Sequence, residues 1–452
     1  MDNRQPKPHN PARLRHECGR CETHFEAPRS FVTATPWIAT MTNAKRTQLA
    51  AGCTSLVMAF ALLQNSAAED WPNWGGRWHD GISREVGFEN AWPTAGLPAE
   101  WTCEIGTGFS SMAVAGEHLF AMGHADGMET VWSLNSQTGE VNWKHSYPSE
   151  LIPNLHEGGP CSTPTIDENR VYTLGKEGQL FCLNRKDGSV VWQSLLQSEL
   201  GVKLPEWGFS SSALILDHQL ILEAGRVVSF DKSTGKKLWQ TEVHEAGYGS
   251  AAAFTSDGKK MLATLDCDGL RIVSPEDGSE IAFQAWKSPY KTNATTPIIA
   301  DDKIFISSGY KVGCGVFQFS QNQLKQVYVN TNMKNHFNNS ILIDGWLYGF
   351  DGDSHNGRNV TLNCVNLSSG ELKWKQRGLG CGSLIAADDK LIILAETGDL
   401  VLAKVSSDSF TEFARSPFLR GRCWTTPVLA NSHVYGRNAD GTLVCVKLPH
   451  IY

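Results

Sequence analysis

The chain has 452 residues, of which 41% are hydrophobic and 19% charged, so it can bury a large core and is not globally disordered. Its 42 Gly and 15 Trp favour many tight turns and a repeated Trp position over a helix bundle. Residues 69–452 carry 32 Lys and Arg against 43 Asp and Glu, and an acidic body without a basic stripe argues against nucleic-acid binding. The length allows three ordinary domains or one large repetitive domain.

The first predicted element is a targeting segment. Lys45 and Arg46 precede an apolar run and a stretch of small residues, which predicts a signal peptide over 41–68. Two alternatives stay open, an uncleaved membrane anchor and a lipoprotein attached through Cys53, which lies in a lipobox-like sequence. Residues 1–40 are then either disordered or absent from the translated protein. We expect an exported chain, periplasmic or extracellular, with no membrane span after cleavage.

A repeat of about 44 residues follows. In residues 162–192 an apolar strand, a second apolar strand, an alternating third strand and a short fourth strand are separated by turns. Four short strands at this period are typical of a propeller blade. We predict an all-β, eight-bladed propeller of four-stranded antiparallel blades over 98–452, preceded by a lead segment over 69–97. The eight units open near Ser111, Ser162, Ser211, Ser250, Thr295, Asn339, Gly382 and Thr425.

The fourth strand has a signature in which a turn Gly is followed four residues later by Trp. The Gly permits a positive φ, and the Trp can lie flat between neighbouring blades. In the fourth unit we expect Phe283, one residue further along, to replace the Trp, and the units near 316–328 and 399–413 are degenerate. The signature pairs are Gly139 with Trp143, Gly188 with Trp192, Gly235 with Trp239, and Gly370 with Trp374.

The last unit ends near Leu448 without a fourth strand of its own. Pro98–Trp101 supplies a Trp that belongs to no other unit, so we expect an N-terminal strand near Trp101 to complete the last blade. This pairing would close the ring and leave no open sheet edge.

Nine cysteines follow the predicted signal peptide, an odd number that leaves at least one thiol free or joined to another chain. Cys182, Cys364 and Cys445 occupy one equivalent place in three units, where we expect small buried hydrophobic residues. Cys161, Cys381 and Cys423 lie where units begin and are harder to assign.

The Asp/Thr-Gly-x3-Trp turn resembles the repeat of pyrroloquinoline-quinone-type propellers. Residues 71–83, which begin Trp-Pro-Asn-Trp-Gly-Gly-Arg, resemble the opening of secreted bacterial members that are similar to the propeller lipoprotein of outer-membrane assembly. The resemblance covers about 70–448. The resemblance implies that a member acting as a quinoprotein dehydrogenase would carry adjacent cysteines and an Asp base beside calcium. This chain has no Cys-Cys dipeptide and no Cys-x-x-Cys-His haem motif.

A candidate site follows from the expected fold, because the segments before the first strands of all blades converge near the axis as a funnel. Aromatic and basic side chains there would suit a planar anionic ligand, with Arg as carboxylate partner and Trp as stacking surface. The alternative is an ordinary wet channel mouth. We assign no catalytic or metal-binding residue. The binding candidates are His156, Glu157, Trp207, Tyr290, Lys291, His336, Arg422 and Trp424, with Phe109, Phe209, Tyr248, Asn293, Asn338, Arg377 and Arg420 as further funnel residues.

Two function hypotheses result. The first is a secreted, monomeric binding or scaffold module of the bacterial envelope, whose partner is an envelope protein, a peptide or a small anionic ligand in the funnel. The second is a dehydrogenase of alcohols or sugars that depends on pyrroloquinoline quinone and calcium. The sequence favours the first hypothesis, under which no cofactor is needed.

Overall fold

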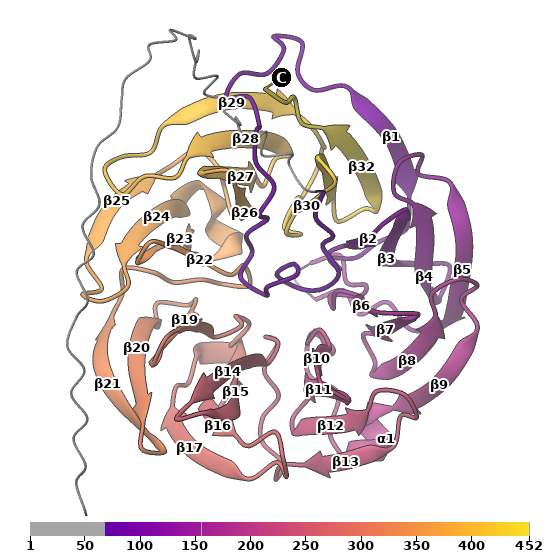
Figure 1. Cartoon of the computed structure of the whole chain (residues 1–452), viewed down its shortest axis with the longest axis vertical. Coiled ribbons are helices and arrows are strands. Elements are labelled where there is room, and N and C mark those ends of the chain that lie inside the picture. Colours follow the sequence, from indigo (N-terminus) through magenta and orange to yellow (C-terminus); the bar gives the residue numbers. More distant parts are fainter. Residues whose placement is uncertain (1–67, 155, 452) are drawn as a thin grey trace, which may run out of the picture. The chain divides into compact units, whose positions relative to one another are not determined.

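The computed structural model describes residues 68–154 and 156–451. Within them, eight four-stranded antiparallel sheets surround a central axis (Figure 1), which confirms the predicted all-β, eight-bladed propeller. The signal peptide predicted over 41–68, the alternative anchor at Cys53 and the extension over 1–40 lie outside the described residues, apart from Ala68. None of the described helices has the length and apolar content needed to cross a membrane.

Blades 1 to 4 each use four consecutive strands, numbered from the axis outward. Their strands are β2 (Ala113–Ala115), β3 (His118–Ala125), β4 (Met128–Asn135) and β5 (Val141–Pro148); β6 (Thr165–Asp167), β7 (Arg170–Leu174), β8 (Gln179–Asn184) and β9 (Val190–Leu195); β10 (Leu214–Leu216), β11 (Gln219–Glu223), β12 (Val227–Asp231) and β13 (Lys237–Gln240); and β14 (Ala252–Ser256), β15 (Lys259–Leu265), β16 (Gly269–Val273) and β17 (Glu280–Ala285).

Blades 5 to 7 follow the same order, and blade 8 borrows its outer strand from the other end of the chain. Their strands are β18 (Ile298–Ala300), β19 (Lys303–Ser308), β20 (Gly313–Ser320) and β21 (Gln323–Asn330); β22 (Ile341–Ile343), β23 (Trp346–Asp351), β24 (Thr361–Asn366) and β25 (Leu372–Gln376); β26 (Ser383–Ala387), β27 (Lys390–Leu394), β28 (Asp399–Lys404) and β29 (Glu412–Pro417); and β30 (Val428–Ala430), β31 (His433–Arg437), β32 (Thr442–Lys447) and β1 (Ala99–Glu104). The described helical turns are α1 (Leu196–Leu200), η1 (Pro289–Lys291) and η2 (Ser354–Asn359).

Packing between blades explains the apolar sequence of the inner strands. Every residue of β11 and of β27 is buried, because both faces of these strands pack against neighbouring blades. The outer strands alternate instead, and in β9 only Trp192 is buried. The hydrophobic core therefore forms layers between blades, which together make the ring a fixed scaffold for the loops near the axis.

The ring closes through the two ends of the described chain. Strand β1 pairs antiparallel with β32, and Trp101 lies opposite Cys445. The Trp101 indole nitrogen donates a 3.0 Å hydrogen bond to the Ser136 carbonyl of blade 1. The predicted closing strand near Trp101 is thus confirmed, and β1 covers the edge that β32 would otherwise leave unpaired.

Four docking Trp residues pack on the turn Gly of the next blade, not on the Gly of their own turn. A Cβ atom added at Gly188 would lie 2.5 Å from the Trp143 ring, and the Trp143 indole donates a 3.0 Å hydrogen bond to Arg185 in the same turn. The Gly is therefore required both by its φ of 72° and by the ring that covers it. The same arrangement joins Trp101 to Gly139, Trp192 to Gly235 and Trp239 to Gly278.

The expectation that Phe283 replaces this Trp is wrong. The bulge in blade 4 aligns Ala282, not Phe283, with the docking Trp of other blades, and Phe283 is 41% exposed with the Arg271 guanidinium 4.9 Å above its ring. In blade 5 the docking residue is Tyr328, which covers Gly370. The two degenerate units still form fourth strands, β21 and β29.

The nine cysteines among the described residues are free thiols. Cys182, Cys364 and Cys445 are fully buried and lie opposite the docking Trp residues of their blades, as expected for small hydrophobic side chains.

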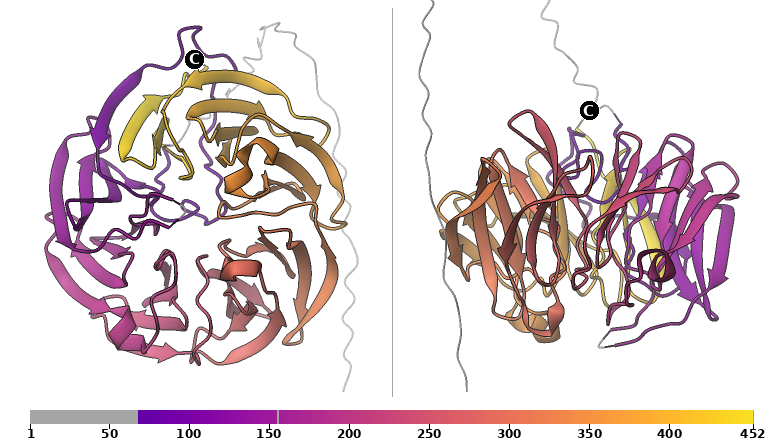
Figure 2. Two further views of the ribbon diagram at one scale, coloured as in Figure 1. Left: turned by 180° about the vertical axis from the view of Figure 1, so that it is seen from behind. Right: turned by 90° about the horizontal axis from the view of Figure 1, so that it is seen from below.

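The lead segment crosses one face of the ring (Figures 1 and 2). Trp71 exchanges two 2.8 Å backbone hydrogen bonds with Val114 of blade 1, and the Glu85 carboxylate accepts a 2.7 Å bond from the Ser432 N–H of blade 8. These contacts lie along the first strands and the turns that follow them. We call this the plug face, and we call the opposite face, from which the chain enters each first strand, the funnel face.

Candidate functional site

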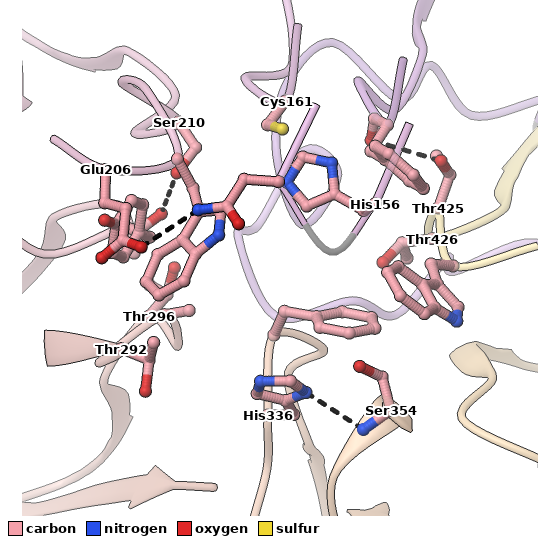
Figure 3. A pocket seen from close by; sticks show the side chains of 18 of the residues that line it. His156, Cys161, Glu206, Ser210, Thr292, Thr296, His336, Ser354, Thr425 and Thr426 are labelled. Atoms are coloured by element: carbon pink, nitrogen blue, oxygen red, sulfur yellow. Dashed lines mark hydrogen bonds between the residues drawn. The ribbon is translucent and has the colours of Figure 1, made fainter. Parts of the chain in front are cut away.

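The funnel face opens into a cavity of about 900 Å³ on the propeller axis (Figure 3). Its walls come from the segments before the first strands and from loops between second and third strands. The Trp74 side chain of the lead segment also lines it and donates a 3.0 Å hydrogen bond from its indole nitrogen to the Thr296 hydroxyl of blade 5. A side chain of the lead segment, which crosses the plug face, thus forms part of the wall of a cavity that opens on the funnel face.

Aromatic rings form a continuous arc around the cavity. Phe109 stacks on Trp424 with ring centroids 5.6 Å apart, and Phe337 meets the same Trp at 4.7 Å. A further pair, Trp207 and Tyr248, lies 5.7 Å apart. Because the rings support one another, the wall is a rigid, largely apolar surface. From blade to blade the arc runs through His156, Phe109, Trp424, Phe337, His336, Tyr310 and Tyr290.

The two histidines of the arc are neutral at pH 7. Burial lowers the pKa of His156 to about 4, and the charges of Lys176 and Arg422 act in the same direction. Burial likewise lowers the pKa of His336 to about 4, against the charge of Asp353. Both Nδ1 atoms accept backbone hydrogen bonds, 2.8 Å from the Gly158 nitrogen and 3.1 Å from the Ser354 nitrogen, so the ring proton lies on Nε2.

Arg422 lies over the face of Trp424, with its guanidinium carbon 4.4 Å from the ring centroid. The same guanidinium pairs with Glu157 at 3.3 Å. Both side chains of this pair are partly exposed, so the attraction between them is weakened by solvent. The charge that was expected to recruit an anionic ligand is therefore already matched by a neighbouring carboxylate.

The lining carboxylates hold protein groups. Glu396 accepts a 2.9 Å bond from the Cys381 N–H and a 3.0 Å bond from the Trp424 indole, and Glu206 accepts a 3.0 Å bond from the Asn154 amide. In the residues that the structure describes, no group of three or more His, Cys, Asp or Glu could hold a metal ion. This donor set does not fit the calcium that accompanies a quinone cofactor.

Six of the eight binding candidates from the sequence line the cavity. Glu157 is absent from the lining but pairs with a lining residue, Arg422. Lys291 lines a smaller neighbouring pocket and pairs with Glu245 at 2.8 Å, so it lies away from the arc. The six lining candidates are His156, Trp207, Tyr290, His336, Arg422 and Trp424.

Several further funnel residues have other roles. Phe209 is core, and Asn293 and Asn338 are buried and donate side-chain hydrogen bonds to backbone carbonyls. Arg377 and Arg420 are exposed and do not line the cavity, whereas Phe109 and Tyr248 do.

The sequence reasoning missed several lining residues that the site uses. Trp74 bonds to a residue 222 positions away, and no local pattern could place it there. Tyr310 and Phe337 also line the cavity, and their place near the inner end of a blade was the available signal. Cys161, half-buried on the wall, lies immediately before the opening of the second blade (Figure 3).

Comparison with known proteins agrees with the fold and the repeat. A curated relative, outer membrane protein assembly factor BamB of Salmonella typhimurium, is 24% identical over 331 residues, 70% of this chain and 77% of the relative. The crystal structure of BamB from Moraxella catarrhalis aligns with a TM-score of 0.57 at 14% identity, covering 79% of this chain and 99% of that one. A europium-containing methanol dehydrogenase aligns with a TM-score of 0.63 at 9% identity, covering 84% and 89%.

The dehydrogenase likeness shows the fold alone, since propellers of one architecture carry unrelated functions. The family model described as outer membrane protein assembly factor BamB matches residues 87–264 and 127–376, which together make up more than half of the chain. The chain therefore belongs to this family of pyrroloquinoline-quinone-like repeat propellers.

Proposed function

We propose that the protein is a non-catalytic binding module of the bacterial envelope, whose funnel receives an apolar or aromatic segment of a partner protein. The observation that carries the proposal is the continuous arc of aromatic rings around an open cavity. Family membership supports the location, because the similar proteins are named as factors of outer-membrane protein assembly.

The charges of the cavity support a peptide over a small anion. His156 and His336 are neutral, and Arg422 is paired with Glu157, so an anionic ligand would have to displace that carboxylate. Aromatic anchors surrounded by polar groups are the usual composition of a protein-binding hot spot. Serine and threonine hydroxyls at the wall, such as those of Thr292 and Ser354, would satisfy the backbone of an inserted segment.

The proposal is tested by selecting peptides from a random library on the immobilised full chain and measuring their affinity by fluorescence anisotropy. Loss of a central aromatic anchor costs about 2 kcal/mol or more, so we expect Trp424→Ala and Tyr290→Ala to weaken binding by about tenfold or more. Trp78→Ala is the matched control, because Trp78 is 59% exposed and belongs to the lead segment, outside the cavity lining. Selected peptides that bind all three variants equally would overturn the proposal.

A quinone-dependent dehydrogenase remains the second candidate, favoured by the size of the cavity and by the aromatic side chains that line it. Titration with pyrroloquinoline quinone and calcium, followed by dye-linked oxidation of an alcohol panel, separates the two. We expect no binding at micromolar cofactor. Micromolar binding that is lost in Arg422→Ala or Trp424→Ala, together with dye reduction, would contradict the non-catalytic assignment.

A further inference from the structure

Two buried cations lie behind one wall of the funnel. Lys176 and Arg437 are both fully buried, and in the described part of the chain neither forms an ion pair with a carboxylate. An uncompensated charge inside a protein is costly, so such a pair of cations needs a nearby negative partner.

The ammonium of Lys176 points at a cysteine. Its Nζ lies 3.7 Å from the Cys161 sulfur, and this is the hydrogen bond that its side chain makes among the described residues. The aliphatic stem of Lys176 packs against Gly208. A Cβ atom at position 208 would lie 2.3 Å from the Lys176 Cγ, so only a glycine leaves room for the stem. The position of the charge beside the sulfur is thus imposed by packing on both sides of the stem.

The carboxylate of buried Glu129 hydrogen-bonds to the backbone of Lys176 and not to its ammonium. Both oxygens accept 3.2 Å bonds from the Lys176 N–H, and one also accepts the Tyr147 hydroxyl at 2.9 Å. Burial raises the pKa of Glu129, and the Lys176 charge acts in the opposite direction.

Arg437 adds a second cation on the same side. Its guanidinium donates to three carbonyls, those of Met122 at 2.5 Å, Gly106 at 2.7 Å and Asn438 at 3.4 Å, and none of them carries a charge. Burial lowers the pKa of Arg437 to about 9, and a charge on Cys161 acts in the opposite direction. Lys176, whose Nζ contacts the Cys161 sulfur directly, is therefore the cation that would stabilise a negative charge there.

Cys161 is half-buried and lines the cavity, so small molecules that enter the funnel can reach its sulfur (Figure 3). Its sulfur also lies 3.6 Å from the Gly159 carbonyl, a weak contact that only the protonated thiol can use as a donor. An ammonium beside a sulfur favours the thiolate, which is the nucleophilic form of a cysteine.

We propose that Cys161 is a modification site, a nucleophile on the funnel wall whose sulfur lies against the buried Lys176 ammonium, and that it reacts with small electrophiles, hydrogen peroxide in particular. The sulfur attacks one oxygen of the peroxide, an S–O bond forms, and the O–O bond breaks. Hydroxide leaves and takes up a proton from solvent to become water. The sulfur is oxidised to a sulfenic acid and the peroxide is reduced. The site is independent of the proposed peptide binding.

The chain contains its own comparison for the test. Cys103 and Cys161 are the two described thiols that are not fully shielded, and burial raises the pKa of Cys103. Native full-length protein is treated with iodoacetamide between pH 6 and 9, and the labelled peptides are quantified by mass spectrometry. A cysteine beside an ammonium is the better nucleophile at pH 7, so we expect Cys161 to react about tenfold faster than Cys103 or more.

Equal rates for the two thiols would overturn the proposal. Lys176→Met keeps the length of the stem and removes the charge, so it should slow labelling of Cys161 about tenfold. Lys144→Met is the matched control, because Lys144 lies over the Trp132 ring and acts on Cys103 instead. Unchanged labelling of Cys161 in Lys176→Met also counts against the site. If that variant does not fold, the comparison of the two thiols in the native chain decides.

The peroxide step has its own readout. After brief treatment with hydrogen peroxide, dimedone should label Cys161 as a sulfenic acid, and Cys161→Ser should lose this label. Dimedone labelling that appears at Cys103 first would contradict the assignment.

Discussion

At the residue scale, the contact between a Trp and the Gly of the next blade determines how neighbouring blades join. Gly188 needs its positive φ for the turn and has no room for a side chain beneath Trp143. Gly127 has nearly the same φ, 74°, but no atom lies within 4 Å of an added Cβ. Comparing substitutions at Gly127 and Gly188 therefore separates the cost of the backbone conformation from the cost of disturbing the contact between blades.

We predict that Gly127→Ala costs about 1 kcal/mol of unfolding free energy, because it strains the left-handed backbone only. Gly188→Ala should cost about 1–3 kcal/mol more, because its methyl group also displaces the Trp143 ring. Urea unfolding of the two variants measures the difference. Equal losses of unfolding free energy would mean that the Trp143 side chain does not stabilise the turn at Gly188.

The neutral histidines of the cavity predict a stability change with pH. The folded pKa of His156 and of His336 is about 4, below the ordinary value of 6.5, so the unfolded chain binds more protons between these values. Their contribution is complete above pH 6.5 and is lost as the pH falls from 6.5 to 4. His336→Asn keeps an acceptor for the Ser354 N–H and cannot titrate.

The difference between wild type and His336→Asn isolates this effect from buried acids such as Glu129, whose raised pKa acts in the opposite sense. We expect wild type to lose more unfolding free energy than the variant between pH 7 and pH 4.5. Denaturant unfolding at the two pH values measures this, and parallel losses would show that the His336 ring is not protected from protonation.

At the scale of elements, closure of the propeller depends on β1. This strand lies near the start of the described chain and pairs with β32 near its end. Deleting residues 98–103 removes most of β1, exposes the edge of β32 and uncovers Gly139. Trp101→Ala alone should cost about 3–5 kcal/mol, as for other buried Trp side chains. Calorimetric melting should show a large loss for both changes, and little for Trp78→Ala at an exposed position. An unchanged melting temperature after the deletion would refute the role of β1 in closure.

The sequence predicted the elements well because each blade repeats a local pattern. Turn Gly and docking Trp residues marked four outer strands directly, and the leftover Trp101 marked the fifth. Phe283 was misplaced because an aromatic residue was sought one position beyond the usual spacing, whereas blade 4 keeps that spacing and has Ala282 at the docking position. Tyr328 was missed for a related reason, since its unit lacks the Gly that precedes the Trp elsewhere.

At the scale of the whole molecule, the lead segment and the funnel give the ring two different faces. The sequence could predict that loops converge on the axis, and six of eight candidate residues line the cavity as a result. It could not predict that Trp74 reaches the cavity, because that contact spans 222 residues. Nor could it show that Glu157 pairs with Arg422, and this pairing supports the proposed apolar segment over the small anionic ligand among the predicted partners.

The central claim is that the funnel, and not the plug face, receives a partner. A photo-reactive amino acid is placed in living cells at Tyr290, which is 69% exposed and lines the cavity, or at Trp78, which is 59% exposed in the lead segment outside it. We predict that the probe at position 290 crosslinks to an apolar or aromatic segment of an envelope protein, mapped by mass spectrometry, and that the probe at position 78 does not. Equal crosslinking from both positions, or crosslinking from position 78 alone, would contradict the account.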